Sequence, residues 1–84
     1  MAGRIVSVMR YRKLSGEAGV QAYAHGPGWI HLQFVRGGTY EYTSRSVGRA
    51  NLQKMKRLAH AGEGLTTFIN QHPEVKNGYA RRLE

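Results

Sequence analysis

The sequence predicts one small α+β domain, in which an antiparallel β-meander of three to four strands is followed by two α-helices. Its 84 residues are enough for one domain with a modest core and too few for two. In the first half, apolar and polar residues alternate, as they do in half-buried strands. In the second half, apolar residues recur every three or four positions, as they do on one side of a helix. A strand-rich half before a helical half is typical of the α+β class.

Four segments are expected to form strands: Ile5–Arg12, Val20–His25, Trp29–Val35 and Thr39–Thr43. Glycines separate them, and Gly26–Gly28, with its central proline, is the clearest turn in the chain. The third of these strands shows the cleanest alternation. The order of the strands in the sheet stays open, above all the pairing of the first one.

The loop between the last two strands is predicted from the parity of the residues on either side of it. Leu32 and Phe34 share one face of their strand, and Tyr40 and Tyr42 share one face of the next. A three-residue loop over Arg36–Gly38 places all four side chains on the same face, whereas a two-residue loop separates them. We therefore expect the longer loop, with one of its glycines supplying a positive φ.

Two helices are expected after the strands, over Val47–Ala61 and Leu65–Gln71, and Thr43–Ser46 offers caps for the first. The glycines of Gly62–Gly64 end the first helix, and its glutamate favours the start of the second. The remaining Glu74–Arg82 is a basic tail with room for one short helix. The apolar side of the first helix is expected to consist of Val47, Ala50, Met55, Leu58, Ala59 and Ala61, with Leu52 at its edge.

The composition limits the chemistry. The chain has no cysteine, which excludes disulfides, cysteine-based zinc sites, iron–sulfur clusters and thiol catalysis, and suits a reducing cytoplasm. We expect neither a signal peptide nor a membrane span, because no apolar run is long enough. The net charge of +8 favours a polyanionic partner such as RNA or DNA, although a charge of this size also serves solubility.

No arrangement of residues indicates an enzyme, a cofactor or a metal site. No nucleophile has a plausible neighbouring base, and no pair of acids has a reason to lie close together. Glu41 is expected to pair across the sheet with a basic residue. The histidines match no standard metal-ligand spacing; they are His25, His31, His60 and His72.

The first predicted helix has a strongly basic side. Between Thr43 and Gly62 there are five basic residues and no acid, whereas helices that serve only solubility usually mix both signs. Such a side could lie along a phosphate backbone, and the alternative is a merely solvated face. The candidate nucleic-acid-binding residues are Arg45, Arg49, Lys56 and Arg57, with Arg10 and Arg12 as extensions.

Two aromatic side chains are weaker candidates for binding. Trp29 and His31 share the strand face opposite the apolar residues of that strand, so on an open face they could stack on bases. The alternative is that Trp29 packs beneath the N-terminal strand or loop, and the usual burial of a large apolar ring favours this alternative. Tyr40 and Tyr42 are expected in the core or at its edge.

A series of motifs runs from the second strand to the second helix: Tyr23, Ile30-x-Leu32-x-Phe34, Gly37, Tyr40-x-Tyr42, Met55–Ala59, Ala61–Leu65 and Phe68–Ile69. In these residues the chain resembles the KTSC family, a small domain named for its occurrence at the C-terminus of lysyl-tRNA synthetase-like proteins. The likeness covers about residues 20–69 of a single domain over 1–84, and leaves out the strand at 5–12 and the tail at 73–84. Two features depart from the family pattern: Ala24 replaces the usual Asp, and Arg45–Gly48 stands where Val-Pro is usual.

The resemblance implies a small β-meander followed by two helices, and it implies no activity. Its link with a tRNA enzyme favours RNA by association. We therefore expect a cytoplasmic RNA-binding accessory module that acts through an electrostatic helix face with weak sequence preference. The alternative is a protein–protein interaction module whose partner is acidic or contacts the apolar residues around Trp29. We expect no membrane insertion, and whether the chain is a monomer or a homodimer stays open.

Overall fold

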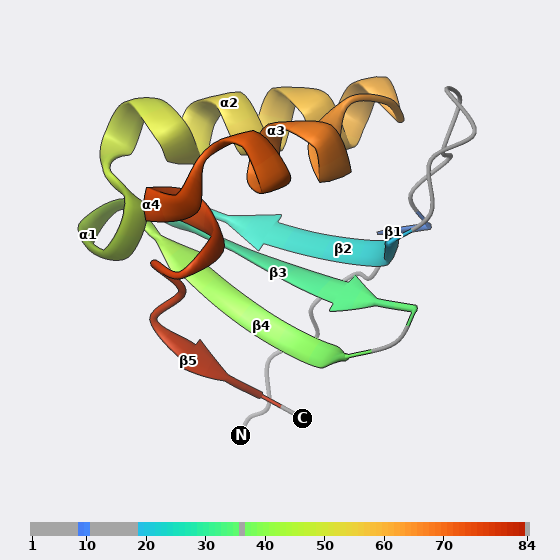
Figure 1. Ribbon diagram of the computed structural model, residues 1–84, viewed down its shortest axis with the longest axis horizontal. Coiled ribbons are helices and arrows are strands. Elements are labelled where there is room, and N and C mark those ends of the chain that lie inside the picture. Colours follow the sequence, from blue (N-terminus) through green and yellow to red (C-terminus); the bar gives the residue numbers. More distant parts are fainter. Residues whose placement is uncertain (1–8, 11–18, 36, 84) are drawn as a thin grey trace.

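The computed structural model describes residues 9–10, 19–35 and 37–83 of the chain. It has five antiparallel strands in the order β1-β2-β3-β4-β5, with four helices on one face of the sheet (Figure 1). The predicted α+β meander followed by helices is confirmed. The elements are β1 (Met9–Arg10), β2 (Val20–Gly26), β3 (Trp29–Phe34), β4 (Gly38–Thr43), α1 (Ser44–Val47), α2 (Arg49–Ala61), α3 (Leu65–Gln71), α4 (Pro73–Lys76) and β5 (Arg81–Arg82).

The hairpin between β3 and β4 keeps the aromatic residues on one face, as predicted. Leu32 lies opposite Tyr40 and Phe34 lies opposite Gly38, so three residues connect the paired strands. This loop lies one residue earlier in the chain than we expected. Gly38 adopts a φ of 89°, a backbone conformation that favours glycine.

Only two residues of the predicted N-terminal strand, Ile5–Arg12, lie within the described part of the chain. Met9 pairs with Tyr23 and Arg10 pairs with Ala22, so β1 lies at the edge of the sheet beside β2. The rest of the predicted strand, Arg12 included, lies outside the described residues.

The basic tail expected at Glu74–Arg82 includes the short helix that we allowed for, as part of α4, but the residues after it form a strand that was not predicted. After α4 the chain turns back to the sheet, and β5 pairs with β4 as a fifth strand that sequence periodicity did not indicate. Gly78 makes this return feasible, because a Cβ there would collide with the carbonyl oxygen of Glu74 and lie 3.0 Å from that of Ser46. Two residues are too few to show an alternating pattern, and β5 is held in an extended conformation by its pairing with β4.

The single helix predicted over Val47–Ala61 is divided in two. Gly48 has φ 93° and ψ 147°, a conformation almost confined to glycine, and it separates α1 from α2. Thr43 caps α1 as predicted: its hydroxyl accepts from the Ser46 backbone N–H, and the Ser46 hydroxyl accepts from the Thr43 N–H. The change of direction lets α2 lie across the sheet beside α3 (Figure 1).

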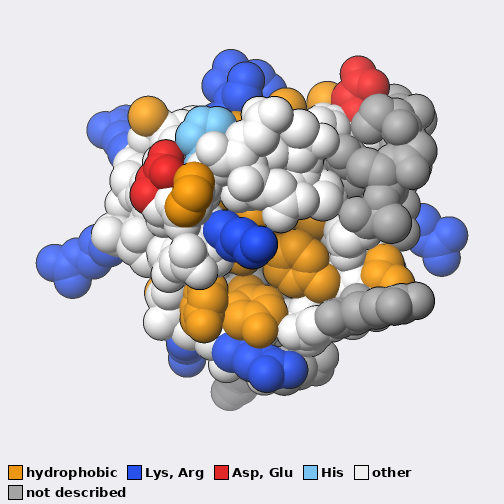
Figure 2. Space-filling model, viewed as in Figure 1, with side chains coloured by type: hydrophobic (Ala, Val, Ile, Leu, Met, Phe, Trp, Pro, Cys, Tyr) orange, Lys and Arg blue, Asp and Glu red, His pale blue; other side chains and the backbone are white. Residues whose placement is uncertain are grey.

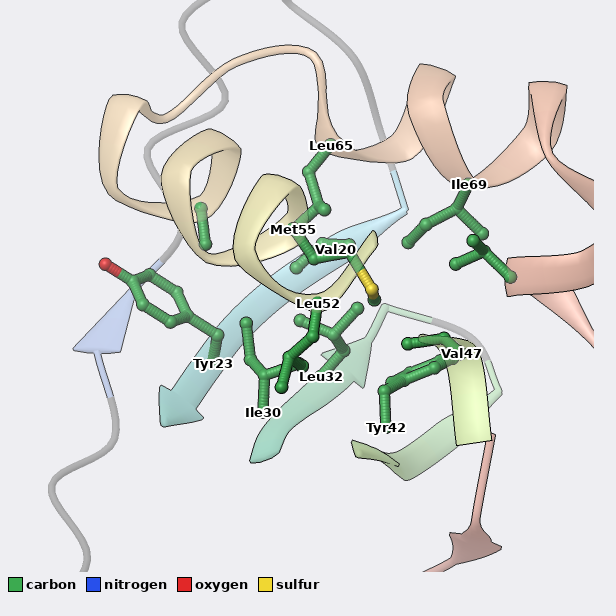
Figure 3. Close-up of a cluster of buried hydrophobic side chains, with 12 residues drawn as sticks. Val20, Tyr23, Ile30, Leu32, Tyr42, Val47, Leu52, Met55, Leu65 and Ile69 are labelled. Atoms are coloured by element: carbon green, nitrogen blue, oxygen red, sulfur yellow. The ribbon is translucent and has the colours of Figure 1, made fainter. Parts of the chain in front are cut away.

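The buried side of α2 is rotated relative to the prediction. Leu52, Met55 and Ala59 are buried at helical spacing, whereas Ala50 and Ala61 are exposed. Leu52 thus lies at the centre of the apolar side rather than at its edge. Figure 3 shows this side chain beside Ile30 and Leu32 of β3, within the cluster of buried residues from the sheet and the helices.

Candidate nucleic-acid interface

One side of α2 carries a row of polar and basic residues that runs beside the core. Arg49, Gln53, Lys56 and His60 are spaced four, three and four positions apart, so they lie one above another along the helix. The sequence placed them opposite the apolar side. Because Leu52 is central to the core, the row instead flanks the core and runs next to β2.

Contacts with the end of β2 fix this row. The Lys56 ammonium donates to the Gly26 carbonyl oxygen over 2.6 Å. The His60 ring lies edge-on to His25, with 4.9 Å between ring centroids, and its Nδ1 is 3.4 Å from the Tyr23 hydroxyl. Lys56 and His60 therefore have structural contacts as well as positive charge.

Positive groups gather closely enough here to affect a titration. Burial, then the neighbouring His60 and Lys56, lowers the pKa of His25 below its usual value. His25 is consequently held in its neutral form more firmly than a free imidazole.

The exposed cations near this row are Arg45 on α1 and Arg49 and Arg57 on α2. Both ion pairs found within the described ranges involve Glu41, so none of these three arginines is paired with a described carboxylate. Arg57 is displaced around the helix from Lys56, toward the solvent side. We call Arg45, Arg49, Lys56 and Arg57 the helical basic surface.

Arg10 does not belong to this surface. Its neighbour Met9 packs against the core on the helix-covered side of the sheet, and side chains alternate along a strand. Arg10 therefore lies on the opposite face of the sheet, at the edge strand. The structure separates it from the four helical cations that the sequence grouped with it.

The far sheet face, which bears no described helix, carries its own row of side chains. Trp29 packs across Gly26 of the adjacent strand, and its ring centroid lies 4.3 Å from that of His31. His31 Nε2 is 2.9 Å from one Glu41 oxygen, and Arg81 Nε donates to the other over 2.9 Å. The prediction that Glu41 pairs across the sheet is confirmed. We call these four residues, Trp29, His31, Glu41 and Arg81, the far-face row.

This row neutralises its own charges. Hydrogen bonding from His31, followed by hydrogen bonding and charge from Arg81, lowers the pKa of Glu41 against the opposing effect of burial. The Trp29 ring is half-buried and engaged with Gly26 and His31 rather than standing clear as a stacking platform.

A third feature, which sequence reasoning missed, is a hollow of about 660 Å³ between the β3–β4 hairpin, α3, α4 and the segment that leads to β5. Its aromatic residues include Phe34, Tyr40, Tyr42 and Tyr79. The sequence assigned Tyr40 and Tyr42 to the core or its edge, and Tyr42 is indeed buried. Burial, with Tyr40 and Tyr79 nearby, raises the pKa of Tyr42 to about 12. We call this feature the aromatic hollow.

The described residues contain no group of three or more His, Asp or Glu side chains placed to hold a metal ion. No helix among them is long and apolar enough to cross a membrane. Comparison of the chain with protein-family models, with curated proteins and with solved structures found no match. The resemblance to the KTSC family stays a prediction.

Proposed function

We propose that this domain is an RNA-binding accessory module and that the helical basic surface contacts the phosphate backbone. One observation carries the proposal: Arg45 on α1 and Arg49 and Arg57 on α2 are exposed without a described carboxylate partner. A surface built for solubility alone gains from mixed signs, because opposite charges one helical turn apart stabilise each other. Uncompensated arginines instead attract phosphates and release their counterions.

The surface has one cation held by the backbone and three exposed cations. Lys56 is held to the Gly26 carbonyl, and the exposed arginines extend from the same two helices. Contacts of this kind recognise the phosphate backbone and carry little sequence information. We propose a module that binds without catalysis, in the cytoplasm, in keeping with the resemblance to a family linked with a tRNA enzyme.

Fluorescence anisotropy of labelled single-stranded RNA, tRNA and duplex DNA at several salt concentrations tests the proposal. Each lost phosphate contact should reduce the slope of log affinity against log salt by about 0.7 for a single strand. We expect Arg49→Gln and Arg57→Gln each to show this reduction, and the double variant to show both. Preference among the three probes then identifies the class of nucleic acid.

The matched control is Arg81→Gln, which removes the same charge from the far-face row, where Arg81 is paired with Glu41. It should leave the salt slope unchanged. Equal losses from Arg81→Gln and Arg57→Gln would mean that net charge alone attracts RNA and that the helical basic surface is not the site. Absence of RNA binding at low salt would reject an RNA role and favour a protein partner.

A further inference from the structure

The aromatic hollow has the size of a ligand site and is open to solvent on one side. Its volume of about 660 Å³ lies within the usual range for small-molecule pockets, roughly 300–1,000 Å³. Figure 2 looks into it: hydrophobic side chains gather in a recess below α3 and α4, with a basic side chain above them and another below. None of this is required by the helical basic surface.

Aromatic rings form much of the wall. Tyr79 meets Tyr40 edge to face with 4.6 Å between ring centroids, and Phe34 meets Tyr40 in the same way at 5.9 Å. The Tyr79 side chain is 42% exposed although it is packed on another ring, so part of its surface remains available to a ligand. Rings of this kind favour a flat, unsaturated ligand over an aliphatic one.

The hollow also holds polar groups that an apolar ligand would leave unused. Asn70 and Asn77 are among the lining residues. The Asn77 amide nitrogen already donates to the Pro73 carbonyl oxygen over 3.2 Å, which leaves its oxygen as an acceptor. Thr66 also lines the hollow, and its buried hydroxyl oxygen has no hydrogen-bond partner within the described chain. This oxygen is itself inaccessible, so the hydrogen-bonding capacity of the hollow comes from the two amides, which favour a ligand with hydrogen-bonding edges.

The charge around the hollow selects an anion. Lys76 is a lining residue, and the guanidinium carbon of Arg82 lies 5.6 Å from the centroid of the Tyr40 ring. No carboxylate is among the described lining residues. A flat ring with hydrogen-bonding edges, attached to a negative group, would match the aromatic rings, the amides and the positive charges of the hollow.

We propose that the aromatic hollow binds a nucleobase together with its phosphate, at an unpaired nucleotide of single-stranded RNA. The base stacks against Tyr79 and Tyr40, the amides contact its edge, and Lys76 faces the phosphate. The assignment to an RNA strand rests on the proposed function, whereas recognition of a nucleotide does not. α1 links the two surfaces, because it carries Arg45 and packs through Ser46 against Gly78, the residue before Tyr79.

The experiment is a ¹H–¹⁵N NMR titration of the full chain with UMP, AMP, uridine, inorganic phosphate and a short single-stranded RNA. We expect a mononucleotide at millimolar concentration to shift the backbone and side-chain amides of Asn70 and Asn77 and the amide of Tyr79. Uridine and phosphate alone should bind more weakly, because each lacks one half of the recognised chemistry. Shifts from mononucleotides but none from the RNA would retain the nucleotide site and reject the strand as its source.

Variants separate stacking from general damage to the fold. Tyr79→Ala should weaken the mononucleotide by about 5- to 150-fold, the range for losing one base–aromatic stack, whereas Tyr79→Phe should bind nearly as the natural chain does. Lys76→Gln should weaken UMP and leave uridine unchanged. No shifts of the hollow residues with UMP or AMP, or equal shifts with uridine and UMP, would overturn the proposal.

The two proposals can fail separately. The Arg49→Gln, Arg57→Gln double variant should retain mononucleotide binding, because neither residue lines the hollow. If that variant keeps its full RNA affinity while mononucleotides still shift the hollow residues, the helical basic surface is rejected and the aromatic hollow stands.

Discussion

The helical basic surface and the far-face row both contain arginine, and they differ in whether its charge is balanced. On the far face, Arg81 and His31 both contact Glu41, and the charge of Arg81 is balanced by this carboxylate within the sheet. On α1 and α2, the exposed arginines form no ion pair with a described carboxylate. Charge that is balanced locally stabilises the fold a little, whereas unbalanced charge is available to a polyanion. A basic residue therefore indicates a binding surface only where the structure shows no carboxylate that balances its charge.

This comparison predicts that the far-face row affects stability and that the helical basic surface affects binding. The largest effect is expected for Trp29→Ala. The ring is half-buried across Gly26, so its loss should cost about 2 kcal/mol, less than the roughly 3–5 kcal/mol of a fully buried aromatic residue. Urea unfolding measures this change in the free energy of unfolding.

RNA affinity of the same variant tests the stacking hypothesis that the sequence raised for Trp29 and His31. If the far face is structural, the folded Trp29→Ala protein binds RNA as tightly as the natural chain. A loss of more than about fivefold in affinity, measured where the variant is still folded, would show that bases stack on this ring.

Lys56 is expected to affect both stability and RNA binding, so its substitution sharpens the comparison. Its ammonium donates to the Gly26 carbonyl oxygen, so Lys56→Met should lower the free energy of unfolding by about 1 kcal/mol. Methionine preserves much of the packing of the aliphatic stem, and the lost hydrogen bond accounts for the change. Arg57→Gln, on the same helix but exposed, should alter the free energy of unfolding by less than about 0.5 kcal/mol.

In RNA-binding measurements, we expect the order of the Lys56→Met and Arg57→Gln variants to be reversed. Arg57→Gln should weaken RNA binding at least as much as Lys56→Met, because the Lys56 charge is already directed at a backbone carbonyl. If Lys56→Met leaves stability unchanged and abolishes RNA binding, the contact with Gly26 is incidental and Lys56 is a direct phosphate ligand.

The sequence predicted the parts of this molecule that depend on local patterns. Alternation predicted β2, β3 and β4 to within a residue or so at each end, and the parity argument placed Tyr40 on the face of Leu32. The glycines of Gly62–Gly64 predicted where α3 begins, and His72 followed by Pro73 predicted where it ends. These features depend on neighbours in the chain, which the sequence contains directly.

What the sequence could not predict depends on contacts between distant segments. The turn at Gly48 changes the direction of α2, and that in turn decides which residues of α2 flank the core. The aromatic hollow needs Tyr79 beside Tyr40, and that pairing exists only because the chain returns to the sheet as β5. A lone Tyr in a basic tail gave no signal of this return, although the adjacent Gly78 is the residue that permits it.

The smallest effect expected is a pH dependence of stability, which should occur in one pH range for His25 beside α2 and in a lower range for the far-face row. The pKa of His25 is lowered in the fold, so the folded state binds fewer protons than the unfolded state once pH falls below about 6.5. Stability that is present above this pH is lost as pH falls toward the lowered pKa. The pKa of Glu41 is also lowered, so its contribution is lost only below about pH 4.5, through the breaking of the far-face row.

Thermal unfolding from pH 7.5 to pH 3.5 should therefore show two separate declines. His25→Gln should remove the upper decline and keep the lower one, and Glu41→Gln should do the reverse. RNA affinity at constant salt should rise through the upper window, because His25 gains positive charge beside the helical basic surface as stability falls. An affinity that stays flat there would mean that RNA does not approach the β2 side of α2, and the contact surface would then be limited to the outward-facing arginines of α1 and α2.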